Sequence, residues 1–266
     1  MDRDLVFTDI HGHYLPHLDD GASSWEVALD MARGAVAEGI GYLIATPHQL
    51  GTYRHNAAER IRQQTAQFQK LLRQENVPLE VLAGADVRIE SDVVAALRSG
   101  QVMTLGDHHR HVLLELPHEI YVPMERLIDQ LLRSGIVPIL SHPERNAVLA
   151  RSPSIVEDLV RRGCLMQVTC GSLLGEFGRQ AQQVAERLIA SRRVHFLASD
   201  AHGVQKRPPC MRRAYERAAH LSDKHYARLI CCDNPYAVFR GQDVVALEPS
   251  SRQRRWNFWR LWQPAG

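Results

Sequence analysis

The chain has 266 residues, 45% of them hydrophobic, with 32 basic and 30 acidic residues and a formal net charge of +2. Such a length and apolar content allow a sizeable core, so we expect a globular protein, and the balanced charge gives no global indication of a nucleic-acid partner. The acidic N-terminus has too short an apolar run for a signal peptide, and no segment reaches the roughly 18 apolar residues of a spanning helix.

Short apolar runs rich in β-forming residues alternate with helical patterns along the chain. Seven such runs cover residues 5–11, 42–48, 80–86, 112–117, 137–144, 165–172 and 194–202. Between them, residues 23–39 read as a helix capped by Ser23 or Ser24 and ended by Gly39, and residues 123–135 as a helix from Pro123 to Gly135. Near-continuous apolar strands predict a parallel sheet covered on both faces. With no linker or repeat, residues 1–240 are predicted to form one α/β domain.

The carboxyl ends of the predicted strands carry the chemistry. Six of the seven runs finish on a possible metal ligand, and the set in chain order is His11, His13, His48, Asp86, Glu115, His142, Asp200 and His202, with a Gly171-Ser172 turn after the sixth run. In α/β folds, and above all in β/α barrels, these ends open onto one face. The sequence therefore predicts that these residues share one pocket.

The residue types in this set indicate metal ions. His11 and His13 point the same way from one strand because the period of a strand is two. Imidazole and carboxylate without thiolate suit manganese, zinc or iron rather than a structural zinc site. Because a catalytic ion usually takes three or four protein ligands, we expect two or three divalent ions, with manganese preferred over iron and zinc.

Seven segments together resemble a known family. They are DIHGHYLPHLDDG, ATPH, GAD, LLELP, SHPER, QVTCGSLLGEFG and LASDAH, in order from about residue 5 to Pro235. The chain resembles the PHP metal-phosphoesterase superfamily and, within it, the bacterial CpsB/YwqE-like protein tyrosine phosphatases of polysaccharide loci. The DDG, HPER and Arg-Pro-Pro sequences favour this branch over histidinol-phosphatase or polymerase-associated PHP domains.

The resemblance implies a fold, a ligand set and one departure from the family pattern. The fold is a distorted (β/α)7 TIM-like barrel. The three implied ion sites are His11, His13, Asp86 and Asp200 for the first, bridging Asp86 with Glu115 and His142 for the second, and Asp20, His48 and His202 for the third. The family usually has glutamate where this chain has Asp86, so the bridging arm is one methylene shorter here. We expect Asp9 and Asp19 to orient neighbouring groups.

Phosphate ester hydrolysis sets the remaining expectations. A water held by two ions on Asp86 is the expected nucleophile, and Arg145 and Arg207 are expected to bind the phosphate. A thiol-based phosphatase needs an arginine six residues after its cysteine, and none of the five cysteines has one. Five cysteines without CxxC spacing fit a reducing compartment, so the cytoplasm is expected.

The expected activity is therefore a metal-dependent phosphotyrosine-protein phosphatase. The resemblance implies a bacterial tyrosine autokinase controlling capsule or exopolysaccharide synthesis as its substrate, with no nucleic-acid partner. Two alternatives stay open: a phosphoesterase acting on a small phosphomonoester or a nucleic acid, and a non-catalytic metal-binding docking module.

Two further segments are distinctive. Residues 108–111, HHRH, precede a predicted strand, and we expect them in an exposed loop at the opposite end of the barrel. Residues 241–266 form a predicted tail in which SRQRRWNFWRLWQPAG holds four arginines, no acid and three of the four tryptophans. Arginines interleaved with indoles suit peripheral contact with an anionic membrane or a partner's groove, and a helix packed on the barrel is the alternative.

Overall fold

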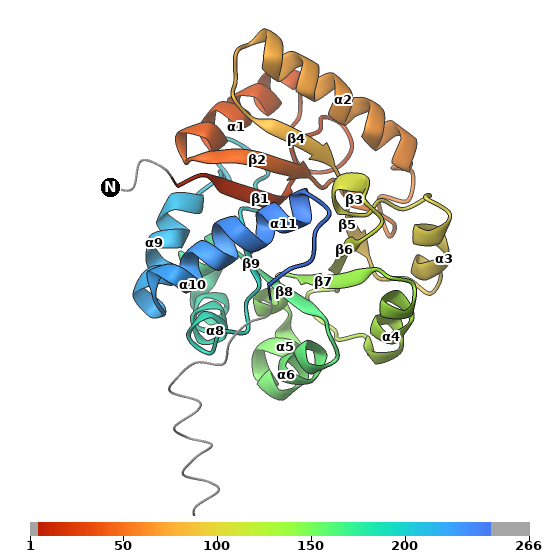
Figure 1. The fold of residues 1–266 in the computed structure, drawn as a ribbon, viewed down its shortest axis with the longest axis vertical. Coiled ribbons are helices and arrows are strands. Elements are labelled where there is room, and N and C mark those ends of the chain that lie inside the picture. Colours follow the sequence, from red (N-terminus) through yellow and green to blue (C-terminus); the bar gives the residue numbers. More distant parts are fainter. Residues whose placement is uncertain (1–4, 246–266) are drawn as a thin grey trace, which may run out of the picture.

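Nine parallel strands form two sheets in residues 5–245, the part of the chain that the computed structural model describes (Figure 1). The three-stranded sheet has the order β1 (Phe7–Gly12), β2 (Ile40–Ala45) and β4 (Glu80–Ala83). The six-stranded sheet has the order β3 (His48–Gln49), β5 (Asp86–Arg88), β6 (His111–Glu115), β7 (Val137–Ser141), β8 (Leu165–Thr169) and β9 (Phe196–Ala198).

The nine strands are the seven predicted runs, two of which are split. β2 and β3 are the halves of the run at 42–48, and β4 and β5 are the halves of the run at 80–86. Pro47 interrupts the first because it has no N–H for the ladder. Gly84 interrupts the second, where a Cβ atom would lie 2.7 Å from Ile44 Cγ2. The prediction of seven strands in one parallel α/β domain is confirmed, and the breaks distort the barrel.

The first and last strands meet through a few bonds rather than a ladder. The backbone N–H of Asp200 donates to His11 O, and that of His13 donates to Ala201 O, both at 2.8 Å. The buried Asp9 carboxylate accepts from the backbone N–H of Ser199 at 3.0 Å. These bonds bring the segment after β9 against the end of β1, which completes a distorted (β/α)7 barrel.

Helices surround the strands (Figure 1). They are α1 (Trp25–Ala37), α2 (Ala58–Gln74), α3 (Val93–Arg98), α4 (Glu125–Arg133), α5 (Ala147–Arg151), α6 (Pro153–Arg161), α7 (Cys170–Leu173), α8 (Gly178–Ala190), α9 (Met211–Leu221), α10 (Lys224–Arg228) and α11 (Asn234–Phe239). Ser24 caps α1 by accepting from the Val27 N–H, as predicted. The predicted start at Pro123 is wrong: α4 begins at Glu125, and Pro123 lies in the preceding loop.

The core has two parts. The larger cluster lies between the strands and the helices. The smaller one joins residues of β1, β2, β6, β7 and β9, including Ile10, Ile44 and Ile139, with Val238 and Phe239 of α11. Because residues from strands around the whole ring meet there, this cluster fills the barrel interior, and α11 covers one end of it (Figure 1).

A buried histidine makes stability depend on pH. His195 is 5% exposed, its Nδ1 accepts from the Met166 N–H at 3.1 Å, and burial lowers its pKa to about 4. Between about pH 6.5 and pH 4, the unfolded chain holds a proton on this ring that the folded chain does not. Stability therefore falls as the pH drops through this window, by up to about 3 kcal/mol from this group.

His195→Asn offers an oxygen in place of Nδ1 but does not titrate. We therefore expect the free energy of unfolding of this variant to change less with pH than that of the wild type. Urea unfolding of the metal-free protein from pH 4.5 to 7 measures it. His111 contributes in the same direction, since burial lowers its pKa to about 4 as well. Equal slopes for the wild type and the variant would show that His195 is not the group responsible.

No helix within residues 5–245 has the length and apolar character needed to cross a bilayer. Of the predicted tail at 241–266, residues 241–245 are described, and the remainder from Ala246 onward lies outside the described residues.

Candidate metal centre

Nine side chains with metal-binding donors gather at the carboxyl ends of the strands. They form four overlapping groups in which the donor atoms lie within 4.8 Å of one another: His13, Asp20, His48 and His202; His11, His142 and Asp200; His11, His13 and Asp86; and His48, Asp86 and Glu115. Within residues 5–245, no residue other than these nine belongs to such a group. The structure thus brings together all nine residues that the sequence nominated, from positions up to 191 residues apart.

His11 in β1 and His13 directly after it form a buried pair. His11 Nε2 and His13 Nε2 are 3.3 Å apart, and Asp200 Oδ1 lies 3.3 Å from the first and 3.4 Å from the second. All three side chains are buried. The imidazoles converge as the strand period predicts, and the carboxylate that follows β9 completes a three-sided donor set.

Asp86 is the central carboxylate. It is fully buried, and neither of its oxygens has a hydrogen-bond partner among the described residues. His48 Nδ1 and His11 Nε2 lie 3.4 and 3.6 Å from Oδ2. A buried carboxylate without hydrogen bonds costs several kcal/mol unless a cation compensates it. The surroundings of Asp86 therefore fit a metal ligand.

Asp20 and His202 form the outer side of the cluster. Asp20 Oδ1 lies 3.4 Å from His202 Nε2 and 3.7 Å from His48 Nε2. The Asp20 side chain is 58% exposed, so this side faces solvent. Glu115 lies across the cluster, with Oε1 3.8 Å from His142 Nε2 and Oε2 3.8 Å from His48 Nδ1.

The four donor groups share several residues, whereas the predicted assignment to three ions shares only Asp86. His48 lies as close to Asp86 and Glu115 as to Asp20, and His142 groups with His11 and Asp200. The predicted division among three ions stays a prediction.

Hydrogen bonds behind the cluster fix the rings. Asp19 Oδ2 lies 2.6 Å from His13 Nδ1 and also accepts from the His48 backbone N–H at 2.9 Å, which agrees with the orienting role expected of it. Gln167 Oε1 lies 2.9 Å from His11 Nδ1. Sequence reasoning missed Gln167, although a polar residue inside the apolar run LMQVT was the available signal. Such bonds direct the opposite nitrogen toward the cluster.

Arg145 and Arg207 meet at Asp200. Arg145 Nη1 donates to Asp200 Oδ2 at 2.7 Å, and Arg207 Nη2 pairs with the same oxygen. The two side chains are 15% and 26% exposed. Both loops bend sharply, since His142, Asp200 and Arg207 all have positive φ angles, at 33°, 52° and 52°. Strained backbone of this kind gathers at functional sites and persists where surrounding contacts hold it.

Burial and the crowded carboxylates of the cluster shift the pKa values of His13 and Glu115. Burial disfavours a charged His13, yet the carboxylates of Asp19 and Asp200 outweigh it and raise its pKa to about 10. Burial, together with the charge of Asp86, raises the pKa of Glu115 to about 7. The negative charge around them thus favours a proton on His13 and on Glu115. Divalent cations would replace these protons, and the imidazole and carboxylate donors suit manganese, iron or zinc.

The thiols are poor candidates for nucleophiles. All five cysteines are buried and free, and burial raises the pKa of Cys164 to about 12 and that of Cys170 well above the usual thiol value. A reactive thiol needs a lowered pKa and access to solvent.

The prediction that residues 108–111 lie in an exposed loop at the opposite end of the barrel is only partly right. His108 and His109 are exposed before the start of β6, the end of the strand away from the cluster, but His111 is buried as the first residue of β6.

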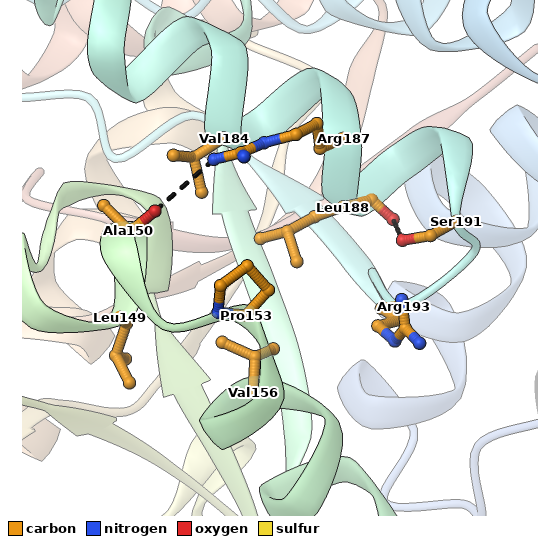
Figure 2. Close-up of a pocket in the computed structure, with 9 residues that line it drawn as sticks. All are labelled: Leu149, Ala150, Pro153, Val156, Val184, Arg187, Leu188, Ser191 and Arg193. Carbon is orange, nitrogen blue, oxygen red and sulfur yellow. Dashed lines mark hydrogen bonds between the residues drawn. The ribbon is translucent and has the colours of Figure 1, made fainter.

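An apolar cavity of about 190 Å³ lies outside the barrel, between α5, α6 and α8 (Figure 2). Leu149, Val156, Val184 and Leu188 line it, and it contains none of the nine donors. The candidate catalytic residues therefore lie at the strand ends and not in this cavity.

A (β/α)7 barrel with clustered imidazoles and carboxylates at the carboxyl ends of its strands is an arrangement typical of metal-dependent hydrolases. Residues 7–240 match the CpsB/CapC family of capsular polysaccharide synthesis, and the chain belongs to this family.

The relatives span nearly the whole chain. The chain is 35% identical over 252 residues to the tyrosine-protein phosphatase YwqE of Bacillus subtilis (strain 168), covering 93% of this chain and 97% of that protein. It is 26% identical over 240 residues to the tyrosine-protein phosphatase CpsB of Streptococcus pneumoniae, covering 88% and 98%. A crystal structure from work on YwqE and CpsB as unique metal-dependent tyrosine phosphatases matches with a TM-score of 0.85 and 34% identity, covering 92% of this chain and 100% of that chain.

Proposed function

We propose that the protein is a metal-dependent phosphotyrosine-protein phosphatase. The observation that carries the proposal is the cluster of nine donors with two guanidinium groups at its edge, an arrangement suited to a phosphoryl group. Membership of the CpsB/CapC family, whose relatives YwqE and CpsB are named tyrosine-protein phosphatases, supports phosphotyrosine as the ester.

The nine donors would hold two or three divalent ions, with manganese as our proposal and iron or zinc as alternatives. The proposed sets are His11, His13, Asp86 and Asp200; Asp86, Glu115 and His142; and Asp20, His48 and His202. Such ions supply Lewis acidity, which acidifies water and neutralises charge on the phosphoryl group.

The chain's own groups position the ester. The guanidiniums of Arg145 and Arg207 are held side by side on Asp200 Oδ2, which leaves other N–H donors for phosphoryl oxygens. Proton transfer to the leaving group is not demanding, because a phenol has a pKa near 10 and phenolate departs readily. We therefore assign no separate general acid.

The proposed substrate is a phosphotyrosine protein, specifically a bacterial tyrosine autokinase that regulates capsule or exopolysaccharide synthesis. The family description supports the capsule connection. We propose a cytoplasmic location, a catalytic domain at residues 1–240, and peripheral membrane contact through the basic and aromatic tail at 241–266.

Chelation and metal replacement test the proposal. EDTA should lower the rate on a phosphotyrosine peptide by more than about 100-fold, and added Mn²⁺ should restore it. The metal-loaded protein should hydrolyse phosphotyrosine peptide faster than histidinol phosphate or a DNA oligonucleotide.

Three other outcomes would each contradict one part of the proposed function. Activity that survives EDTA would reject the metal mechanism. A preference for histidinol phosphate or DNA would reject the substrate. Bound metal without turnover of any ester would indicate a docking module.

A further inference from the structure

β8 is followed by a turn that supplies none of the nine donors, and this turn packs an aromatic ring beside the cluster. α7 follows β8 directly, and the chain then turns through Phe177 into α8. Gly171 lets the turn fold back on itself: the Glu176 backbone N–H donates to Gly171 O at 2.9 Å, and a Cβ on Gly171 would lie 3.0 Å from Phe177 Cε2. The close backbone contact fixes where the Phe177 ring lies.

Two guanidiniums lie over this one ring. The Cζ atom of Arg145 is 4.3 Å from the centroid of Phe177, and that of Arg207 is 5.4 Å away. Both distances are within the roughly 6 Å range of a cation–π interaction. The two arginines follow different strands, β7 and β9, so the ring joins loops that are far apart in the sequence.

Each guanidinium therefore has an ion pair with Asp200 and a contact with the Phe177 ring. Asp200 offers the two guanidiniums a single shared oxygen, and Arg145 Nη2 also lies 3.3 Å from His118 Nε2. Arginine side chains have considerable rotamer entropy, and a planar contact removes part of it before a ligand binds. The ring thus restricts the orientation of both guanidiniums.

We propose that Phe177 is a positioning residue that holds Arg145 and Arg207 in the orientation that binds the phosphoryl group. This inference rests on the proposed function. Because the arginines contact the phosphoryl group in both the ground state and the transition state, loss of the ring weakens binding more than it slows the chemical step. The effect should fall on KM and on the affinity for inorganic phosphate.

The test uses metal-loaded protein and three variants. Phe177→Leu keeps an apolar side chain but removes the ring face, Phe177→Tyr restores a ring, and Phe239→Leu makes the same exchange in α11, away from the strand ends. We expect Phe177→Leu to raise the Kd for inorganic phosphate and the KM for a phosphotyrosine peptide by about 10-fold, with kcat within about 2-fold and an unchanged metal content. Phe177→Tyr and Phe239→Leu should bind phosphate as the wild type does.

A fluorinated series separates the ring's electrostatics from its packing. Replacing Phe177 with mono-, di- and trifluorinated phenylalanine withdraws charge from the ring face at nearly constant shape, and the logarithm of the phosphate Kd should rise steadily with fluorination. Wild-type affinity in Phe177→Leu, or equal weakening in Phe177→Tyr, would overturn the inference. Calorimetry with phosphate reads the effect even if no phosphotyrosine peptide is hydrolysed, so failure of the proposed function stays distinguishable from failure of this one.

Discussion

Asp86→Ala is expected to lower kcat/KM on a phosphotyrosine peptide by at least about 1000-fold, or about 4 kcal/mol of transition-state stabilisation. Asp86 is fully buried and belongs to two of the four donor groups, those with His11 and His13 and with His48 and Glu115. Its removal therefore takes a donor from two groups at once. Mass spectrometry of the purified protein should show a lower metal content than in the wild type.

Asp86→Glu is the matched variant, because it keeps the charge and lengthens the arm by one methylene. The extra group enters a site with no exposed surface, so some packing strain, on the order of 1 to 3 kcal/mol, is expected. We expect partial activity and a changed order of preference among Mn²⁺, Fe²⁺ and Zn²⁺. An Asp86→Ala protein with the wild-type metal content and more than a tenth of the activity would refute the bridging role.

The position of the cluster follows from rules that a sequence expresses directly. Parallel strands with helical crossovers must align their carboxyl ends, so Glu115 after one apolar run and Asp200 after another are predicted to meet, and they lie in the same cluster here. Asp20 is different. It lies in the loop after β1, where no strand rule applies, and only the family resemblance placed it at the site.

What the sequence did not predict depends on packing between distant segments. Gln167 contacts His11 across 156 residues, and its importance appears only when β8 lies beside the cluster. Phe177 is similar, because its contacts with two guanidiniums depend on the tight turn at Gly171. The breaks of two runs at Pro47 and Gly84 were not predicted either, because the apolar pattern continues across both residues.

Removal of Arg145 and Arg207 is expected to produce the second large loss of phosphatase activity. Arg145→Ala and Arg207→Ala should each lower kcat/KM by about 100-fold, since a hydrogen bond to a charged partner contributes about 1.5 to 3 kcal/mol. The double variant should lose about 1000-fold rather than the additive 10,000-fold, because both guanidiniums act from one oxygen of Asp200. Arg145→Lys keeps the charge but not the planar pair of donors, and we expect it to recover less than a tenth of the lost activity.

The same variants distinguish phosphate binding from a purely structural ion pair. In the metal-free protein the two guanidiniums are the cations that compensate the negative charge at Asp200 Oδ2. Bound metal ions would compensate part of the same charge. Arg145→Ala should therefore lower the Tm more in EDTA than in the metal-loaded state, while its loss of phosphate affinity should persist when the metals are bound. If the arginines were only structural, metal loading would restore both the Tm and kcat/KM. A restored Tm with a persistent loss of phosphate affinity would assign the guanidiniums to the phosphoryl group.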